Sequence, residues 1–202
     1  MSPWLLLVAS YLLGAIPASY VAGRLAKGID LREHGSGNLG ATNTFRVLGA
    51  KVAAPVMLFD VLKGWAPTWF FPQWDTSADW RWALAYGAAA IVGHVFSIYM
   101  RFKGGKGVAT ATGVFLALAP AAVGGAFLVW VATLWLGRMV SLASILAAVV
   151  LLPLLWLTSD RWEVRALGVA TAAFVVFAHR ANVGRILRGE EHRFGRKAAA
   201  ER

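Results

Sequence analysis

The chain has no cysteine among its 202 residues and few charged residues. The absence of cysteine excludes disulfide bonds, a thiolate nucleophile and zinc sites with cysteine ligands. Charged residues make up 15% of the sequence, whereas soluble domains carry about 25%. Hydrophobic residues make up 58%, more than a domain of this length can hide from water. The composition therefore excludes an ordinary soluble domain and predicts an integral membrane protein.

Acidic residues are also scarce, with 10 Asp and Glu against 20 Lys and Arg. A nucleic-acid-binding domain gathers such a charge excess on one solvated face. Here the basic residues lie between apolar blocks instead. We therefore expect membrane lipid as the environment and no nucleic-acid partner.

Seven segments approach the roughly 20 apolar residues that cross a bilayer. They are residues 3–23, 50–71, 82–100, 107–120, 121–137, 140–158 and 164–178. The loops on one side hold 16 Lys and Arg and those on the other side three, so the positive-inside rule puts the N-terminus outside and the C-terminus in the cytosol. The prediction is an all-α polytopic membrane protein with about seven transmembrane helices, in a single domain over residues 1–202. A tight turn is expected at Ala119-Pro120-Ala121, and the tail after about residue 184 is expected to leave the membrane.

The first of four polar or glycine-rich stretches on the cytosolic side spans residues 35–46. Its glycines let the backbone approach a ligand, and N–H groups ahead of a helix point at an anion. Neutral donors and one planar cation accompany them: Ser36, Gly37, Asn38, Thr42, Asn43 and Arg46. A capped flexible loop is the alternative, but a nucleotide P-loop is excluded because the Gly-Lys-Ser/Thr ending is missing.

The second stretch, residues 102–110, also opens a predicted helix. Lys103 and Lys106 lie among Gly104, Gly105 and Gly107. Lysine charge, aligned amides and helix dipole all favour phosphate at such a helix start. Membrane anchoring by basic residues is the alternative, but anchoring does not need the three glycines.

The third and fourth stretches lie in the C-terminal half of the chain. His179 and Asn182 share a helix face at the cytosolic end of the last span, and Arg185 follows three residues later. A snorkelling anchor has the same pattern. Ser141 begins the sixth span, where a helix cap is the alternative to a ligand contact.

Three ionisable residues lie within the predicted spans. Asp60 and Lys63 are three residues apart on one helix face, where they either pair with each other or support the site. His94 is either a helix–helix contact or part of the site wall. The four histidines show no His-Glu-x-x-His spacing, so no metal site is expected.

Four motifs occur in order along essentially the whole chain. They are Gly-Ser-Gly-Asn-x-Gly-Ala-Thr-Asn, Asp-x-x-Lys-Gly, Gly-His with Lys-Gly-Gly-Lys-Gly-Val-Ala-Thr, and His-Arg-x-Asn-x-x-Arg. Together they resemble the membrane-integral, acyl-phosphate-dependent glycerol-3-phosphate acyltransferases of bacteria, the PlsY family. Two departures are visible: Ala181 stands where the family often has Glu, and Ser97 stands where proline is common.

The resemblance implies acyl transfer from acyl phosphate to the sn-1 hydroxyl of glycerol 3-phosphate, which gives lysophosphatidic acid and phosphate without a cofactor. It implies a bacterial cytoplasmic membrane location, a site that faces the cytosol, and a link to a soluble enzyme that makes acyl phosphate. The catalytic residues carried over are Ser36, His179, Lys106 and Arg46. The substrate-binding residues carried over are Gly37, Asn38, Thr42, Asn43, Lys103, Gly104, Gly105, Gly107, Ser141 and Asn182.

The proton acceptor and the class of protein each have alternatives. The proton of the attacking hydroxyl passes either to His179 or to an oxygen of the donor's own phosphate, and we favour the phosphate route with His179 and Ser36 orienting groups. The acyltransferase family with a His-x4-Asp motif is excluded, because the fifth residues after the histidines are Leu39, Tyr99, Gly184 and Lys197. A transporter or channel for an organic phosphate is the alternative from another class, but neither polar residues through the outer half nor an internal repeat is seen.

Overall fold

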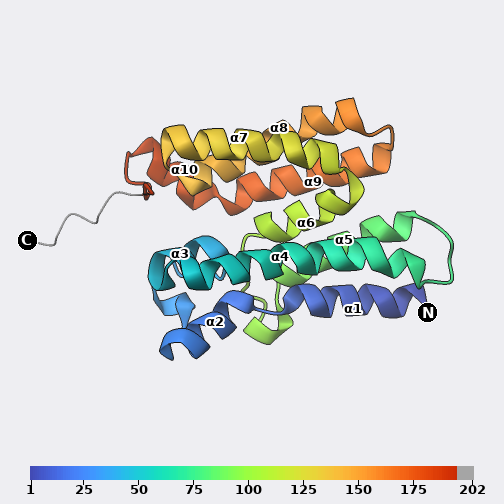
Figure 1. The fold of residues 1–202 in the computed structure, drawn as a ribbon, viewed down its shortest axis with the longest axis horizontal. Coiled ribbons are helices and arrows are strands. Elements are labelled where there is room, and N and C mark those ends of the chain that lie inside the picture. The colour runs from blue at the N-terminus through green and yellow to red at the C-terminus, as the bar shows by residue number, and fades with distance from the viewer. Residues whose placement is uncertain (195–202) are drawn as a thin grey trace, which may run out of the picture. The chain divides into compact units, whose positions relative to one another are not determined.

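The structure is a computed structural model that describes residues 1–194 (Figure 1). All regular elements among these residues are helices, which confirms the predicted all-α class. The α-helices are α1 (Pro3–Ala15), α2 (Ala18–Lys27), α3 (Ala41–Leu48), α4 (Ala50–Phe70), α5 (Arg81–Val95), α6 (Val108–Leu118), α7 (Pro120–Gly137), α8 (Val140–Thr158), α9 (Trp162–Ala178) and α10 (Arg180–Leu187). Single-turn 3-10 helices lie at Leu31–Glu33, Phe71–Gln73 and Ile98–Met100.

The chain divides into two compact units, Met1–Pro120 and Ala121–Arg202. The first unit contains α1 to α6 and both glycine-rich stretches, and the second contains the remaining helices with Ser141 and the stretch that begins at His179. The expectation of a single domain over residues 1–202 stays a prediction. The predicted exit of the tail concerns in part residues 195–202, which lie outside the described residues.

Four helical segments are long and apolar enough to cross a membrane, or five if the bent pair α9 and α10 is one span. These are Pro3–Lys27, Arg81–Met100, Pro120–Gly137 and Val140–Thr158, with Trp162–Leu187 as the bent pair. Of the other two predicted spans, α4 has 21 residues but carries Asp60 and Lys63 in its middle, and α6 has only 11 residues. The described residues therefore contain four or five candidate membrane spans, and the predicted count of seven stays a prediction. The tight turn before α7 is confirmed as the single residue Ala119.

Glycines allow close helix packing in the first unit, where α1 lies along α5 and α4 lies along α6 (Figure 1). A Cβ atom added to Gly14 or Gly93 would overlap backbone across the α1–α5 contact, and one added to Gly64 or Gly113 would do so across the α4–α6 contact. Small residues at such contacts let membrane helices approach closely. This packing fixes α5 and α6, between which the second glycine-rich stretch lies.

The first predicted span is interrupted at Ile16 and Pro17, between α1 and α2. The backbone carbonyls freed by the break need donors, because water is scarce at membrane depth. Ser97 Oγ donates to the carbonyl of Ala15 at 2.5 Å, and Lys63 Nζ donates to the carbonyl of Ile16 at 2.9 Å. Side chains from α4 and from the residues after α5 therefore stabilise the break.

Candidate active site

The first glycine-rich loop is organised from within by Asn43 at the start of α3. Asn43 is buried, and its side-chain oxygen accepts the N–H of Ser36 at 2.8 Å. Its amide nitrogen donates to the carbonyls of Leu31 and His34 at 3.1 and 3.0 Å. Gly35 has a φ of 64°, and an added Cβ would press on the Asn43 side chain. The loop is therefore a fixed turn in which Ser36 is exposed.

The entry to this loop is held by Asp30. Its carboxylate accepts the N–H and the guanidinium of Arg32, and the shortest of these bonds is 2.6 Å. Hydrogen bonding from Arg32 lowers the pKa of Asp30 to about 2, although burial acts in the opposite direction. The backbone carbonyl of Asp30 accepts a hydrogen bond from His34 Nδ1 at 2.9 Å. Residues 30–34, which lead to Ser36, are thus held in a fixed conformation at neutral pH.

The second glycine-rich loop lies on the end of α5. The N–H of Gly104 donates to the carbonyl of Val95 at 2.9 Å, and the N–H of Gly105 donates to the carbonyl of His94 at 3.1 Å. An added Cβ at Gly105 would meet both the His94 ring and the carbonyl of Leu39, which belongs to the first loop. The structure therefore brings the two glycine-rich loops together within the first unit.

Lys106 and Gly107 lead from this loop into α6. Gly107 has a φ of 78°, in the left-handed region that favours glycine, and precedes the first residue of the helix. Lys106 is half-buried, whereas Lys103 is exposed. The first N–H groups of a helix have no acceptor inside it, so a half-buried cation and a helix start lie next to each other here.

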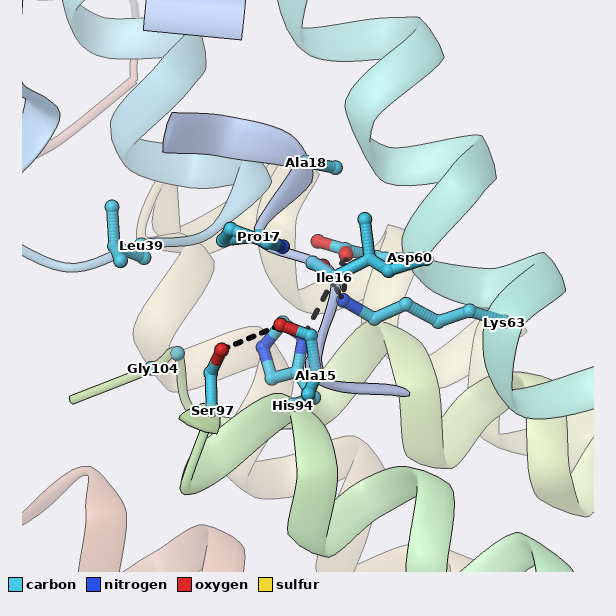
Figure 2. A pocket seen from close by; sticks show the side chains of 11 residues that line it. Ala15, Ile16, Pro17, Ala18, Leu39, Asp60, Lys63, His94, Ser97 and Gly104 are labelled. Carbon is cyan, nitrogen blue, oxygen red and sulfur yellow. Dashed lines mark hydrogen bonds and ion pairs between the residues drawn. The ribbon is translucent and has the colours of Figure 1, made fainter. Parts of the chain in front are cut away.

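A charged cluster lines a small pocket together with Leu39 of the first loop and Gly104 of the second (Figure 2). Lys63 Nζ is 2.7 Å from Asp60 Oδ1, and His94 Nδ1 is 3.6 Å from the same oxygen. All three side chains are buried. Of the readings that the sequence left open, Asp60 and Lys63 do pair with each other, and His94 joins α5 to α4 while its ring borders Gly105.

In the second unit, Ser141 and Asn182 share one carboxylate oxygen. Glu191 Oε1 accepts from Ser141 Oγ and from Asn182 Nδ2, each at 2.8 Å, and Arg185 Nε donates to Oε2 at 2.7 Å. Burial raises the pKa of Glu191, but hydrogen bonds from Asn182, Ser141 and Arg185 outweigh it and hold the pKa below its usual value. The segment after α10 therefore folds back so that Glu191 is buried.

His179 lies at the 54° bend between α9 and α10 and is buried. Its Nδ1 is 2.7 Å from the carbonyl of Val175. A carbonyl can only accept, so Nδ1 carries the proton and Nε2 of the neutral ring is the basic nitrogen.

No three His, Asp or Glu side chains gather as metal ligands anywhere in residues 1–194.

A sequence profile described as glycerol-3-phosphate acyltransferase matches residues 4–189. The chain belongs to the glycerol-3-phosphate acyltransferase family. A glycerol-3-phosphate acyltransferase of Syntrophotalea carbinolica is 42% identical over 191 residues, which are 95% of this chain and 97% of the relative. Glycerol-3-phosphate acyltransferase 3 of Bacillus anthracis is 41% identical over 95% of this chain and 94% of its own.

Two solved structures are similar over almost the whole chain. They are crystal structures of PlsY, an integral membrane glycerol 3-phosphate acyltransferase, in a glycerol 3-phosphate form and a lysophosphatidic acid form. Each has a TM-score of 0.87 and 38% identity and covers 96% of this chain, and the matches cover 96% and 95% of the respective solved chains. The resemblance seen in the sequence motifs is thereby confirmed.

The site residues predicted for this acyltransferase fall in both units. The first unit holds Ser36, Gly37, Asn38, Thr42, Asn43, Arg46, Lys103, Gly104, Gly105, Lys106 and Gly107, and the second holds Ser141, His179 and Asn182. Glu191 is not among the site residues predicted from the sequence. A signal for it was present, because Glu190 and Glu191 are the only acidic residues among the basic residues that follow His179 up to Phe194.

Proposed function

We propose that this acyltransferase uses acyl phosphate as its donor and forms lysophosphatidic acid by acylating the sn-1 hydroxyl of glycerol 3-phosphate. Family membership supports the acceptor, and the two PlsY crystal structures are of a glycerol 3-phosphate form and a lysophosphatidic acid form. The site faces the cytosol from the bacterial cytoplasmic membrane. A soluble enzyme that makes acyl phosphate supplies the donor.

The observation that carries the proposal is the meeting of the two glycine-rich loops at Leu39 and Gly105. Both substrates carry a phosphate, and the donor also carries an acyl chain that must stay in lipid. Two adjoining loops with cations beside them can bind the phosphates. The apolar helices from which the loops extend can keep the acyl chain in lipid. Lys106 and Arg46 are the cations that we assign to the phosphates.

The hydrogen bonds of the second loop support a division of roles among its groups in anion binding. The N–H groups of Gly104 and Gly105 already donate to carbonyls at the end of α5. Their role is therefore to let the backbone lie close to its neighbours, as the overlap of an added Cβ indicates. The phosphate contact is assigned to Lys106 and to the first turn of α6, where helix dipole and N–H groups favour an anion.

The chemistry requires little covalent help from the protein. The acceptor hydroxyl oxygen attacks the acyl carbonyl carbon, the bond from that carbon to the phosphate oxygen breaks, and the departing phosphate takes the hydroxyl proton. Positioning and charge neutralisation supply the acceleration. Ser36 and His179 orient the reacting groups, and the hydrogen bond of His179 to Val175 fixes its ring for that role. The alternative base is Nε2 of His179.

Seven spans with the N-terminus outside remain the proposed topology. All seven predicted segments are helical over most of their length, and the uneven distribution of Lys and Arg supports the orientation. In this arrangement α4 and α6 are the two spans that are not clear from length and hydropathy alone. They pack against each other, and the charged side chains in the middle of α4, Asp60 and Lys63, are buried against the break between α1 and α2 and against His94 of α5.

The deciding experiment is an assay of the purified protein with acyl phosphate and glycerol 3-phosphate. Lysophosphatidic acid and phosphate should form in equal amounts. Acyl-CoA replaces acyl phosphate in the control, in a preparation free of other acyltransferases. Robust product from acyl-CoA alone, with none from acyl phosphate, would defeat the donor assignment.

A further inference from the structure

The proposed chemistry assigns no task to the cluster formed by Asp60, Lys63 and His94. Its members come from α4 and α5, and their side chains are 3%, 1% and 7% exposed. Burying charged groups is costly even when they pair, and ionisable groups within membrane spans are a sign of function. The burial of this cluster therefore points to a role beyond the acyl-transfer step itself.

One edge of the cluster contacts the break between α1 and α2. Lys63 Nζ bridges Asp60 and the backbone carbonyl of Ile16 (Figure 2). Because that nitrogen is held by two partners from different segments, it has a fixed position. Asp60 Oδ1 is fixed in turn by its 2.7 Å contact with this nitrogen.

The opposite edge of the cluster contacts the second glycine-rich loop. The His94 ring presents Nδ1 to Asp60 and Nε2 to the Cα of Gly105, where an added Cβ would overlap it. The carbonyl of His94 also accepts the N–H of Gly105. Both the ring and the backbone of His94 therefore set the path of the chain one residue before Lys106.

We propose that Asp60 holds the ring of His94 against Gly105 and that the two residues thereby position Lys106 and the start of α6 for phosphate binding. Asp60 and His94 are positioning residues in this scheme, since neither touches substrate. Lys63 anchors Asp60. The inference rests on the proposed phosphate contact of Lys106.

A purely structural role makes a different prediction. If the cluster only joined α4 to α5, weakening it would lower thermal stability and reduce all kinetic parameters together. A positioning role acts on ligand affinity, so the KM for a phosphate substrate should rise while kcat changes less. The effects of Asp60 and His94 should also overlap, because one acts through the other.

The test uses Asp60→Asn, His94→Gln and the double variant in the full-length purified protein. Asp60→Asn removes the charge, and His94→Gln keeps an amide near Gly105 but loses the ring that spans the gap to Asp60. Thr68→Val is the matched control, because Thr68 is a buried residue of α4 whose hydroxyl donates to the carbonyl of Gly64 in the same helix. Melting temperature, kcat and both KM values are measured for each protein.

Affinity is also measured without a donor, by titrating the protein with glycerol 3-phosphate and separately with inorganic phosphate. Each single variant should weaken binding of at least one of these ligands about 3- to 30-fold. This is the size of effect expected for a mutation that acts on the ligand through another residue. The double variant should bind the ligand at most about twofold more weakly than the more strongly affected single variant does. Thr68→Val should bind as the unaltered protein does.

Unchanged affinity for both ligands in folded variants overturns the inference, and so do additive effects in the double variant. If neither single variant folds, the cluster is a determinant of the fold and the inference is also wrong. Failure of the donor assignment gives a different result. In that case the unaltered protein makes no lysophosphatidic acid from acyl phosphate, while the titrations without a donor still report on positioning.

Discussion

The side-chain oxygen of Asn43 accepts a hydrogen bond from the backbone N–H of Ser36 at 2.8 Å. Both residues were predicted to line the site, and the structure shows that one of them holds the other. The amide group of Asn43 is occupied by three backbone partners. Direct contact of Asn43 with substrate stays a prediction, but its contribution to the shape of the loop is established.

Replacing Asn43 with leucine should disorder the first loop. The change leaves the N–H of Ser36 and two carbonyls without their partner, and each buried unsatisfied group costs about 1–3 kcal/mol. We expect kcat/KM to fall by more than about tenfold, together with faster proteolysis between residues 31 and 43. Asn43→Asp keeps the acceptor for Ser36 and should be less severe. Activity of Asn43→Leu within twofold of the unaltered protein would contradict this role.

Glu191 is expected to make the stability of the second unit depend on acid pH. The pKa of its carboxyl group is lowered in the folded protein, so this group stabilises the fold above its unfolded pKa of about 4.3. The stabilisation is lost as the pH falls through the lower folded value. Glu191→Gln should lower the free energy of unfolding by about 1–3 kcal/mol at pH 7.

The measurement is unfolding of both proteins in detergent between pH 7 and pH 3. The difference between the two should shrink as the pH drops below about 4.3. Glu190→Gln is the matched control, because Glu190 is exposed and pairs with the exposed Arg188. A difference that is constant over this pH range would show that the charge of Glu191 is not responsible.

Loss of the cations assigned to phosphate should be specific to the motifs. Lys106→Ala and Arg46→Ala each remove a charge-assisted contact of about 1.5–3 kcal/mol, which corresponds to a roughly 10- to 150-fold fall in kcat/KM. Lys51→Ala, an exposed basic residue outside the motifs, is the control. If all three variants show the same small effect, the basic residues serve only as membrane anchors.

Local sequence patterns predicted the helices well because apolar runs, glycines and proline act over a few residues. The break at Pro17 was harder to predict, since it is tolerated only where Lys63 and Ser97 from distant segments supply donors to the freed carbonyls. The same holds for Glu191, whose partner Ser141 is 50 residues away. Residue type indicates that a group can form hydrogen bonds, but tertiary contacts decide which partner it uses.

The proposed topology can be checked with single cysteines, because the chain has no native cysteine. Ser2→Cys and Gln73→Cys should react with an impermeant reagent in intact cells, and Arg193→Cys should react only after lysis. All three positions are exposed in the structure. Labelling of position 193 in intact cells, without labelling of the other two, would reverse the orientation and place the glycine-rich loops outside.

The last prediction is that acyl transfer is direct, without an acyl-enzyme intermediate. The donor is already activated, and Ser36 lies in a glycine turn fixed by Asn43. A serine nucleophile of the Gly-x-Ser-x-Gly type needs a strand that leads into a helix, and residues 1–194 contain no strand. The alternative is a covalent route through Ser36 with His179 as its base.

The two routes differ in what happens when the acceptor is absent. Direct transfer predicts sequential kinetics, with glycerol 3-phosphate required before phosphate is released. The covalent route predicts ping-pong kinetics and a burst of phosphate from the donor alone. The enzyme is therefore incubated with acyl phosphate only, and the Ser36 peptide is examined by mass spectrometry. An acylated Ser36 that is later converted into product would refute direct transfer and leave the substrate assignment intact, because either route yields the same lysophosphatidic acid.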